Sequence, residues 1–258
     1  MEFDDYHAHT NLSYCCEASL TPTDYAEAIR RNQSLRSVAI TNHGFAIYFP
    51  EEIAWQWEFM IHPSLFDEHL AWGNKRLARH LDEVDALREA GLLTGIEVEM
   101  MADGRLTVDP NLVDRLDVIV GGVHWLPVSW RGGSDPGEIL DVWLSHTQRL
   151  VRTGIDVLAH PMRWLSGQVD RIPDEIVPHV VQLAHEAGVA VEINAHYIVE
   201  TDVPLLREAV RTGTPVTFCT DAHRHEEVGH FTYHLHLLEQ AGLTVDDLTF
   251  WQPTRRQR

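Results

Sequence analysis

Seven short runs of apolar and β-branched residues alternate along this chain with longer amphipathic segments. This alternation is typical of repeated βα units, in which each strand of a mainly parallel sheet leads into a helix. Glycines stand between several amphipathic segments and the next apolar run, as expected where a helix ends in a left-handed cap. We therefore expect strands at residues 2–7, 37–41, 93–98, 117–123, 155–159, 189–193 and 215–220.

The 258 residues are enough for one α/β barrel or for two smaller domains. No linker, low-complexity tract or internal repeat divides them. We therefore expect a single domain over residues 1–258. Within it, a long amphipathic segment at 65–90 follows a tryptophan-rich stretch. We expect Trp55, Trp57 and Trp72 to pack on or cover one mouth of the fold.

The chain carries 39 acidic against 20 basic residues, a formal net charge of -19. This charge repels phosphate backbones and anionic membranes, so we do not expect tight nonspecific binding of nucleic acid or membrane. No apolar stretch approaches the roughly 20 residues that span a bilayer, and the first residues are acidic where a secretory signal is basic. The three cysteines form no disulfide framework. These features predict a cytoplasmic protein.

The main functional signal is that each predicted strand ends in a side chain able to bind a metal ion. The first ends in His7 and His9, which lie on the same face of an extended strand. In a β/α barrel the carboxyl ends of all strands meet at one face, so the seven endings converge. A lone histidine there is most often structural, but seven independent coincidences favour a metal site. The remaining endings are His43, Glu97, His124, His160, Glu192 with Asn194, and Asp221 with His223.

In chain order these endings read H-x-H, T-x-H-G, G-x-E, G-x-V-H, H-P, E-I-N and D-A-H. This ordered set, from about residue 5 to residue 225, resembles the polymerase and histidinol phosphatase (PHP) superfamily. The resemblance implies an α/β fold, a distorted (β/α)7 TIM-like barrel. It also implies two or three divalent metal ions, usually zinc, manganese or iron, and hydrolysis of phosphoesters as the commonest activity.

The resemblance further implies three metal sites grouped around one glutamate. The ligands of the first are His7, His9, Glu97 and Asp221; those of the second are Glu97, His124 and His160; those of the third are His43 and His223. A hydroxide held between the first two ions would attack phosphorus while the ions screen the phosphoryl oxygens.

Two positions depart from the pattern. Relatives of the histidinol phosphatase type place a third-site histidine where this chain has Cys15. One alternative is that its thiolate is a zinc-favouring ligand of the third ion, with Cys16 or Glu17 as substitutes. The other is that Cys15 is a buried apolar residue and the third site is occupied weakly or never. Asn42 stands where many relatives have the aspartate of T-D-H, so we expect a changed set of contacts around His43 or a neighbour.

An acidic protein that binds a phosphorylated molecule needs local positive charge. Arg163 and Arg224, close after two of the strand endings, are the best-placed candidates for binding substrate. His196 follows the E-I-N strand and is a candidate general acid or substrate contact. With Glu97 and Asp221 it makes up the predicted catalytic set.

Other titratable residues receive a structural interpretation. Glu99 shares a strand face with Glu97, so we expect it to be a hydrogen-bonding partner of a ligand or a polar residue at the rim. Four histidines near the end of the chain are expected at the solvated surface. They are His225, His230, His234 and His236.

Our leading hypothesis is a metal-dependent phosphoesterase, most simply a phosphomonoesterase, acting on a small phosphorylated metabolite. One alternative is hydrolysis of a C–N or C–O bond, as in amidohydrolases, whose metal ions are usually bridged by a carbamylated lysine. The single lysine here, Lys75, falls in a predicted helix, which disfavours that alternative, although Glu97 could bridge the ions in its place. The other alternative is a non-catalytic metal-binding domain. The pattern specifies neither the native metal nor the oligomeric state.

Overall fold

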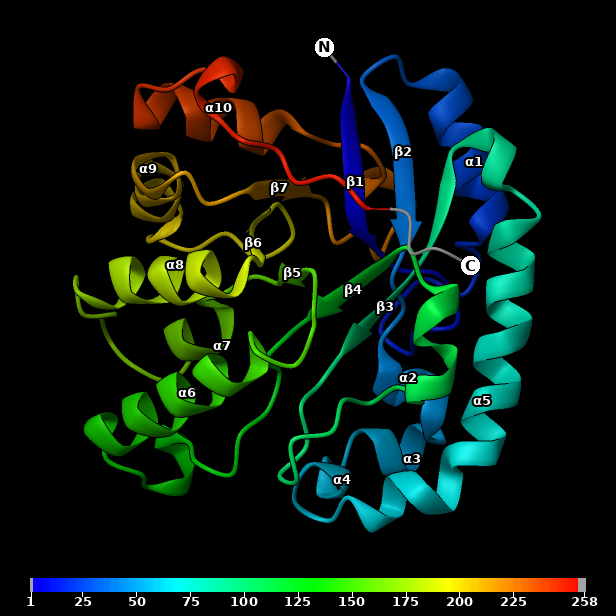
Figure 1. The fold of residues 1–258 in the computed structure, drawn as a ribbon, viewed down its shortest axis with the longest axis horizontal. Coiled ribbons are helices and arrows are strands. Elements are labelled where there is room, and N and C mark those ends of the chain that lie inside the picture. Colours follow the sequence, from blue (N-terminus) through cyan, green and yellow to red (C-terminus); the bar gives the residue numbers. More distant parts are fainter. Residues whose placement is uncertain (1, 255–258) are drawn as a thin grey trace.

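The computed structural model describes residues 2–254 of the chain. Across this range seven strands form one sheet, in which neighbouring strands are parallel and their spatial order follows the sequence. Helices surround the sheet in Figure 1, which confirms the predicted α/β class and the seven-stranded, TIM-like barrel. The strands are β1 (Phe3–Ala8), β2 (Leu35–Ile40), β3 (Leu92–Val98), β4 (Val118–Gly121), β5 (Val157–Leu158), β6 (Ala190–Asn194) and β7 (Val216–Cys219).

Helices follow most of the strands. The short α2, α3 and α4 come after β2 and contain the tryptophan-rich stretch, whereas the long α5 runs beside them along the barrel (Figure 1). The α-helices described in residues 2–254 are α1 (Pro22–Arg31), α2 (Gly44–Tyr48), α3 (Glu51–Ala54), α4 (Glu58–Ile61), α5 (Ser64–Asp85), α6 (Pro136–Leu150), α7 (Arg163–Ser166), α8 (Ile176–Ala187), α9 (Asp202–Thr212) and α10 (Thr232–Ala241). Short 3-10 helices lie at Arg88–Ala90, Pro110–Arg115, Trp130–Gly132, His225–Glu227 and Val245–Asp247.

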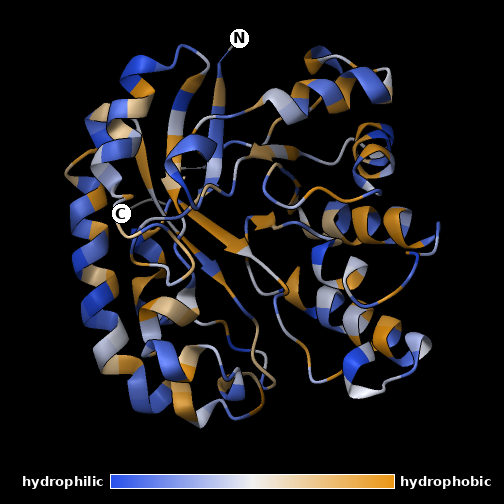
Figure 2. Ribbon diagram, turned by 180° about the vertical axis from the view of Figure 1, so that it is seen from behind, coloured by the Kyte–Doolittle hydropathy of each residue, from blue (hydrophilic) through white to orange (hydrophobic). Residues whose placement is uncertain are grey.

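The sheet is buried on both faces, as parallel sheets of this kind are. In Figure 2 the central strands are mostly hydrophobic, whereas the surrounding helices alternate hydrophobic and hydrophilic residues. The helix α5 packs on β3 and buries a stripe that includes Leu77, Leu81 and Val84. His80 lies on the same buried stripe, so a titratable ring is enclosed between α5 and the barrel.

The first and last strands join near the carboxyl ends of the strands. The Asp221 amide donates to the His7 carbonyl at 2.8 Å, and the His9 amide donates at 3.0 Å to the carbonyl of the residue after Asp221. The buried Asp5 carboxylate accepts hydrogen bonds from the backbone and the hydroxyl of Thr220. The seam between β1 and β7 is therefore closed beside predicted metal ligands.

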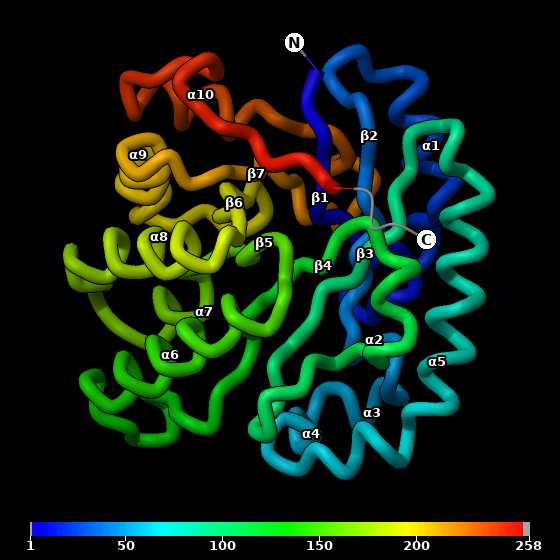
Figure 3. Tube along the Cα trace, in the orientation of Figure 1, coloured from blue at the N-terminus to red at the C-terminus, as the bar shows by residue number. Residues whose placement is uncertain are grey.

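At the opposite end of the barrel, a segment that follows α10 crosses the start of β7. The Val216 amide donates to the Thr249 carbonyl at 2.9 Å, and the Trp251 amide donates to the Val216 carbonyl at 3.0 Å. The Trp251 ring meets the Tyr6 ring edge-on, with 5.2 Å between centroids. Figure 3 shows this segment in red, passing from α10 to the neighbourhood of β1.

All seven predicted strands are present, with boundaries that differ by one or two residues. The predicted helix at 65–90 ends earlier, because α5 stops at Asp85 and a 3-10 turn leads to Gly91, whose φ is 97°. Within residues 2–254, none of the helices combines the length and the apolar composition needed to cross a bilayer.

Candidate metal centre

Glu97, at the end of β3, lies at the middle of a cluster of imidazoles from four other strand ends. Its Oε2 lies 2.5 Å from His43 Nδ1, 3.4 Å from His7 Nε2 and 3.6 Å from His9 Nε2. All four side chains are buried. One oxygen of the carboxylate thus contacts the histidines that follow β1 and β2.

The other oxygen of Glu97 contacts a different pair of histidines. Oε1 lies 3.1 Å from His160 Nε2 and 3.4 Å from His124 Nε2. Gly122 approaches closely here: a Cβ on it would lie 2.7 Å from Glu97 Oε1 and 2.9 Å from a ring carbon of His124. The G-G-V-H sequence therefore leaves room for the carboxylate and the imidazole at this point.

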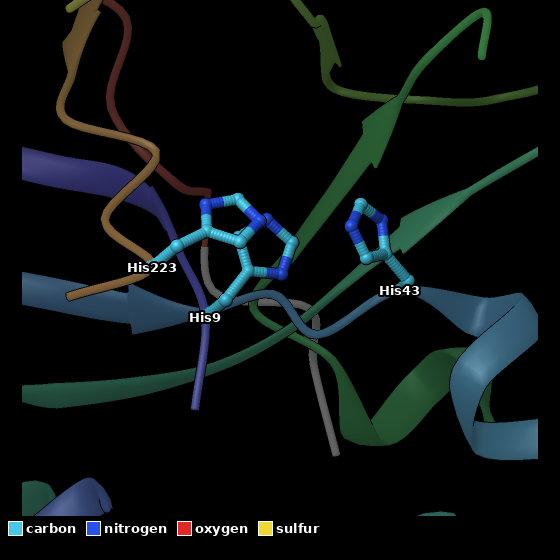
Figure 4. Close-up of side chains that lie close together, drawn as sticks. All are labelled: His9, His43 and His223. Carbon is cyan, nitrogen blue, oxygen red and sulfur yellow. The ribbon is translucent and has the colours of Figure 1, made fainter. Parts of the chain in front are cut away.

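Asp221 completes the cluster from the end of β7. Its Oδ1 lies 3.0 Å from His9 Nε2 and 3.5 Å from His7 Nε2, and its Oδ2 accepts a hydrogen bond from Asn194 at 3.1 Å. The ring of His223 lies 4.4 Å from that of His9 and donates from Nδ1 to the Asp221 carbonyl at 2.7 Å. Figure 4 shows His223 and His9 close together with His43 across from them.

Two of these strand-end residues have left-handed backbone angles. Asp221 has a φ of 50° and His160 a φ of 27°, both unusual outside glycine. Backbone strain of this kind persists only where the surrounding structure fixes it, and it concentrates at functional sites. Here it turns the two side chains toward Glu97 and the ends of β1.

Most of the imidazoles have a partner on the ring nitrogen that faces away from the cluster. His7 Nδ1 lies 2.7 Å from a Glu192 oxygen, and His124 Nδ1 is bonded to Glu99. A histidine that donates from Nδ1 presents the lone pair of Nε2, which is the form that binds metal. Glu99 is thus the hydrogen-bonding partner of His124, one of the predicted ligands, and Glu192 has the same position toward His7.

The protonation states of the two carboxylates favour metal binding as well. Burial alone would raise the pKa of Asp221, but the charge of His7 holds it well below the usual range. Burial would likewise raise the pKa of Glu97, and the charge of His124 lowers it. Burial lowers the pKa of His223 to about 3. Ionised carboxylates and neutral imidazoles are the forms that bind metal ions. Burial would lower the pKa of His7, but the charges of Asp221 and Glu192 raise it, so a metal ion that binds there displaces the proton of His7.

The residues present fit a set of divalent metal ions. Within this cluster, four buried atoms form no hydrogen bond of good geometry in spite of their close neighbours: His43 Nδ1, Glu97 Oε2, His160 Nδ1 and Asp221 Oδ1. Such atoms cost free energy unless a ligand satisfies them. Imidazole with carboxylate suits zinc, manganese or iron. Among the described residues, the groups whose ligand atoms lie within 4.8 Å of one another are His7–His9–Glu97, His7–His160–Asp221, His43–Glu97–His124, His9–His43–His223 and His196–His223–Glu227.

Cys15 lies at the exposed edge of the cluster and belongs to none of the metal-binding groups found among residues 2–254. Partial burial of the thiol and the charges of Asp221 and Glu97 raise its pKa to about 12. In the absence of a metal ion this cysteine is therefore a thiol rather than a thiolate.

The two arginines predicted to bind substrate lie in different surroundings. The Arg163 guanidinium lies 3.7 Å from the centre of the Tyr197 ring, and its Nη2 donates to the Tyr197 hydroxyl at 2.9 Å. That ring lies 5.8 Å from the ring of His160, so Arg163 is next to the cluster. Arg224 is exposed and lines a cavity with His196 and Glu227.

His196 lies at the rim, partly exposed. Its Nδ1 lies 3.1 Å from Glu227 Oε1, and its ring lies 4.7 Å from that of His223. The other oxygen of Glu227 accepts from the His223 amide at 2.7 Å. Glu227 was not among the predicted site residues, although its spacing of four residues from D-A-H placed it nearby.

An aromatic wall adjoins the cluster on the side of α2 to α4. Phe45 stacks on the ring of His43, with centroids 4.5 Å apart, and Trp57 lies nearly parallel to His124 at 6.3 Å. The tryptophan-rich stretch therefore covers part of this mouth, as predicted.

The prediction of four surface histidines at the end of the chain was wrong for one. His234 is fully buried in α10, where its Nε2 lies 2.9 Å from the Ile193 carbonyl. Its neighbours Leu237 and Leu238 are buried too, so the residue belongs to an apolar helix face that the interpretation as a surface segment overlooked.

Comparison with known proteins supports the fold and the motifs. No protein-family model matches the chain. It is 26% identical over 158 residues to the DNA polymerase/3'-5' exonuclease PolX of Bacillus subtilis (strain 168), in an alignment that covers 59% of this chain and 26% of the polymerase. The chain thus spans about a quarter of the length of this relative.

Among solved structures, the histidinol phosphate phosphatase of Lactococcus lactis subsp. lactis Il1403, complexed with zinc, L-histidinol and phosphate, has a TM-score of 0.61 at 17% identity, over 99% of this chain and 98% of that one. A chain of an archaeal ribonuclease P bound to mature tRNA has a TM-score of 0.50 at 13% identity, over 95% and 84%. The ordered motifs and this shared barrel confirm the resemblance of the chain to the polymerase and histidinol phosphatase superfamily.

Proposed function

We propose that this protein is a metal-dependent phosphoesterase that hydrolyses a small phosphorylated metabolite at a centre of two or three metal ions. The observation that carries the proposal is the position of Glu97, whose two carboxylate oxygens contact two different groups of histidines. A carboxylate in this position can bridge two ions, which is the arrangement used for phosphoester hydrolysis.

The residues that would hold the ions are those brought together at the strand ends. His7, His9 and Asp221 would join Glu97 at one ion, and His124 and His160 would join it at another. His43 and His223 would hold a third, with Cys15 as a further donor when its thiol loses its proton. Bound there, divalent ions supply Lewis-acid catalysis, which polarises a phosphoryl oxygen and activates water.

Protein groups beside the cluster would bind and protonate the substrate. The Arg163 guanidinium, held against Tyr197, supplies positive charge for phosphate in an otherwise acidic protein. We assign His196 the role of proton donor to the leaving group, because Glu227 orients its ring at the rim of the cluster. The likeness to the Lactococcus phosphatase, which binds zinc, L-histidinol and phosphate, supports a phosphorylated small molecule as the substrate class.

The alternatives receive less support. Lys75 lies exposed on α5, outside the cluster, so it is not placed to form the carbamylated bridge of an amidohydrolase. A purely structural metal site would not need the partly open rim with Arg163 and His196. We therefore give phosphoester hydrolysis precedence over both.

The test is metal analysis of the purified protein combined with phosphate release from a panel of substrates. The panel contains histidinol phosphate, sugar phosphates, nucleotides and cyclic phosphodiesters. We expect two or three equivalents of zinc, manganese or iron and release from one class. Asp221→Asn should abolish release while the protein remains folded. A protein that binds metal but hydrolyses no member of the panel would contradict the proposal.

A further inference from the structure

A chain of buried hydrogen bonds leads from the metal cluster to the helix α5. His9 Nδ1 lies 3.1 Å from Ser13 Oγ, Ser13 Oγ lies 2.9 Å from Asn42 Oδ1, and Asn42 Nδ2 lies 3.1 Å from His80 Nε2. All four residues are buried. His80 is more than 70 positions away from His9 in the sequence and belongs to none of the motifs at the strand ends.

The direction of each hydrogen bond in this chain follows from chemistry. The Thr10 backbone amide, which can only donate, lies 2.8 Å from the terminal oxygen of Asn42. This contact places the oxygen of the amide toward Thr10 and Ser13, and the nitrogen toward His80. His80 Nε2 must therefore accept, so its hydrogen is on Nδ1. Burial lowers the pKa of His80 to about 4, which keeps the ring neutral.

Ser13 links Asn42 to the cluster. The Asn42 oxygen can only accept, so the single hydroxyl hydrogen of Ser13 is donated to it. Ser13 Oγ then has only lone pairs for its other neighbours. It accepts from the His43 backbone amide at 3.1 Å, and it must accept from His9 Nδ1 as well. His9 consequently carries hydrogen on Nδ1, so Nε2 is the nitrogen left for a metal ion, at the point where it lies 3.1 Å from His7 Nε2 and 3.0 Å from Asp221 Oδ1.

We propose that Asn42 and His80 are positioning residues, which fix through Ser13 the ring nitrogen of His9 that carries hydrogen and so leave Nε2 of His9 free for a metal ion. The metal part of this inference rests on the proposed function. It also gives a reason for the asparagine in T-N-H. An aspartate has no N–H to donate to a neutral His80, whereas the amide of Asn42 donates to His80 and accepts from Ser13.

The first test reads the ring nitrogens directly, in metal-free protein in alkaline buffer, by long-range ¹H–¹⁵N NMR spectra of the histidines. We expect hydrogen on Nδ1 of both His9 and His80. In Asn42→Ala the Ser13 hydroxyl loses its acceptor and can donate to His9, so the hydrogen of His9 should move to Nε2. In Asn42→Asp the acceptor for Ser13 remains, so His9 should be unchanged while His80 moves its hydrogen to Nε2.

The second test measures zinc affinity by competition with a chelator. Replacing a residue that orients a metal ligand typically costs 10- to 100-fold in affinity, and we expect a loss of about that size for Asn42→Ala. Asn42→Asp should stay within a few-fold of the wild type. His80→Leu should weaken zinc binding, and His80→Gln, whose side-chain oxygen can accept from Asn42, should restore it.

A matched control is His146→Gln on α6, because burial lowers the pKa of His146 to about 4 as well, and the residue lies outside this chain of hydrogen bonds. It should change neither the His9 spectrum nor zinc affinity. Heat unfolding of each variant shows which of them remain folded. Asn42→Asp keeps the size and shape of the side chain, so it remains a usable test if Asn42→Ala fails to fold.

Two results would overturn the proposal: hydrogen on Nε2 of His9 in the wild type, or equal loss of zinc affinity in Asn42→Ala and Asn42→Asp. The NMR measurement needs neither metal nor substrate. A protein with the expected ring nitrogens and no phosphate release would therefore contradict the phosphoesterase and leave this inference standing.

Discussion

The two ends of the barrel use polar residues in opposite ways. At the end where the strands finish, buried atoms of His43, Glu97 and Asp221 lie close together without hydrogen bonds of good geometry. At the end where the strands begin, polar groups are paired with one another. The Tyr6 hydroxyl donates to Gln252 at 3.1 Å there.

The pairing at the second end continues around Asp4. Its carboxylate accepts from Ser37 at 2.6 Å and from Gln252 at 3.3 Å, and it forms an ion pair with Arg36. Folding alone favours this arrangement, because a buried polar atom without a partner costs free energy. The opposite arrangement at the other end is therefore explained by something that binds there. The contrast separates residues kept for binding from residues kept for stability.

The largest expected effect on activity is at Glu97, at the centre of the cluster where the strands finish. Glu97→Gln keeps the size of the side chain but removes the charge that contacts both groups of histidines. We expect loss of bound metal and a fall in kcat/KM of about a thousandfold or more, since metal-ion catalysis contributes several kcal/mol. Metal content and phosphate release measure this. As a control, Glu89→Gln at an exposed position should keep both the bound metal and the activity. If Glu97→Gln still bound metal and hydrolysed substrate, the unpaired atoms at this end would not be explained by metal binding.

The next effect concerns buried histidines whose surroundings keep them neutral. Burial lowers the pKa of His234 to about 4, whereas the unfolded chain titrates near 6.5. Above pH 6.5 the ring is neutral in both states, so His234 contributes nothing to the pH dependence of stability. As the pH falls from about 6.5 to about 4, the unfolded chain takes up a proton that the folded protein refuses, so stability falls by about 3 kcal/mol.

His234→Gln should remove this part of the acid sensitivity, since an amide N–H can still donate to the Ile193 carbonyl without titrating. Urea unfolding at neutral and at acidic pH gives the difference in free energy of unfolding. The exposed His236→Gln should lose stability with acid as the wild type does. Equal acid sensitivity of both variants would show that His234 is not kept neutral by folding.

A smaller effect is expected at the paired end. Trp251→Ala removes a half-buried ring that packs against Tyr6, which should lower the free energy of unfolding by about 2 kcal/mol. The value of kcat should not change, because the cluster lies at the other end. Urea unfolding and phosphate release together check this, with the more exposed Trp130→Ala as control. A large loss of kcat would show that the two ends are coupled.

The smallest effect distinguishes the two arginines. Arg163→Ala should raise KM about tenfold, or about 1.4 kcal/mol, by removing a charge-assisted contact to phosphate. Arg224→Ala should have less effect, because Arg224 is exposed to solvent in a cavity beyond His196. Steady-state kinetics of both variants provide the comparison. A larger rise in KM for Arg224→Ala than for Arg163→Ala would show that phosphate binds beside Arg224 instead.

Sequence periodicity was sufficient to predict the fold because a parallel barrel has one short apolar run for each strand. What it missed were boundaries that depend on the tertiary structure. The predicted strand at 155–159 shrinks to β5 (Val157–Leu158), since only these residues pair with both neighbours. The motifs likewise predicted which strand ends meet, because a parallel barrel brings all of them to one face.

The partners of the imidazoles were harder to predict. Glu99 could be found because strand alternation places it on the face of Glu97. Ser13 and Asn42 lie in loops, whose path no periodicity specifies. The burial of His80 could have been predicted from the sequence. It lies at helical spacing on the same apolar stripe as Leu77, Leu81 and Val84. A histidine on such a stripe is buried and therefore needs a hydrogen-bond partner.

The seam between β1 and β7 has a consequence for the order in which the protein assembles. His7 and Asp221 are more than two hundred residues apart in the chain, yet their backbones bond at 2.8 Å and their side chains face the same point. Contacts of such long range form late, because a large loop must close first. In a growing or partly unfolded chain, therefore, the carboxylate of Asp221 has not yet joined the histidines of the other strand ends. Release of metal and opening of the barrel should then occur as a single cooperative event.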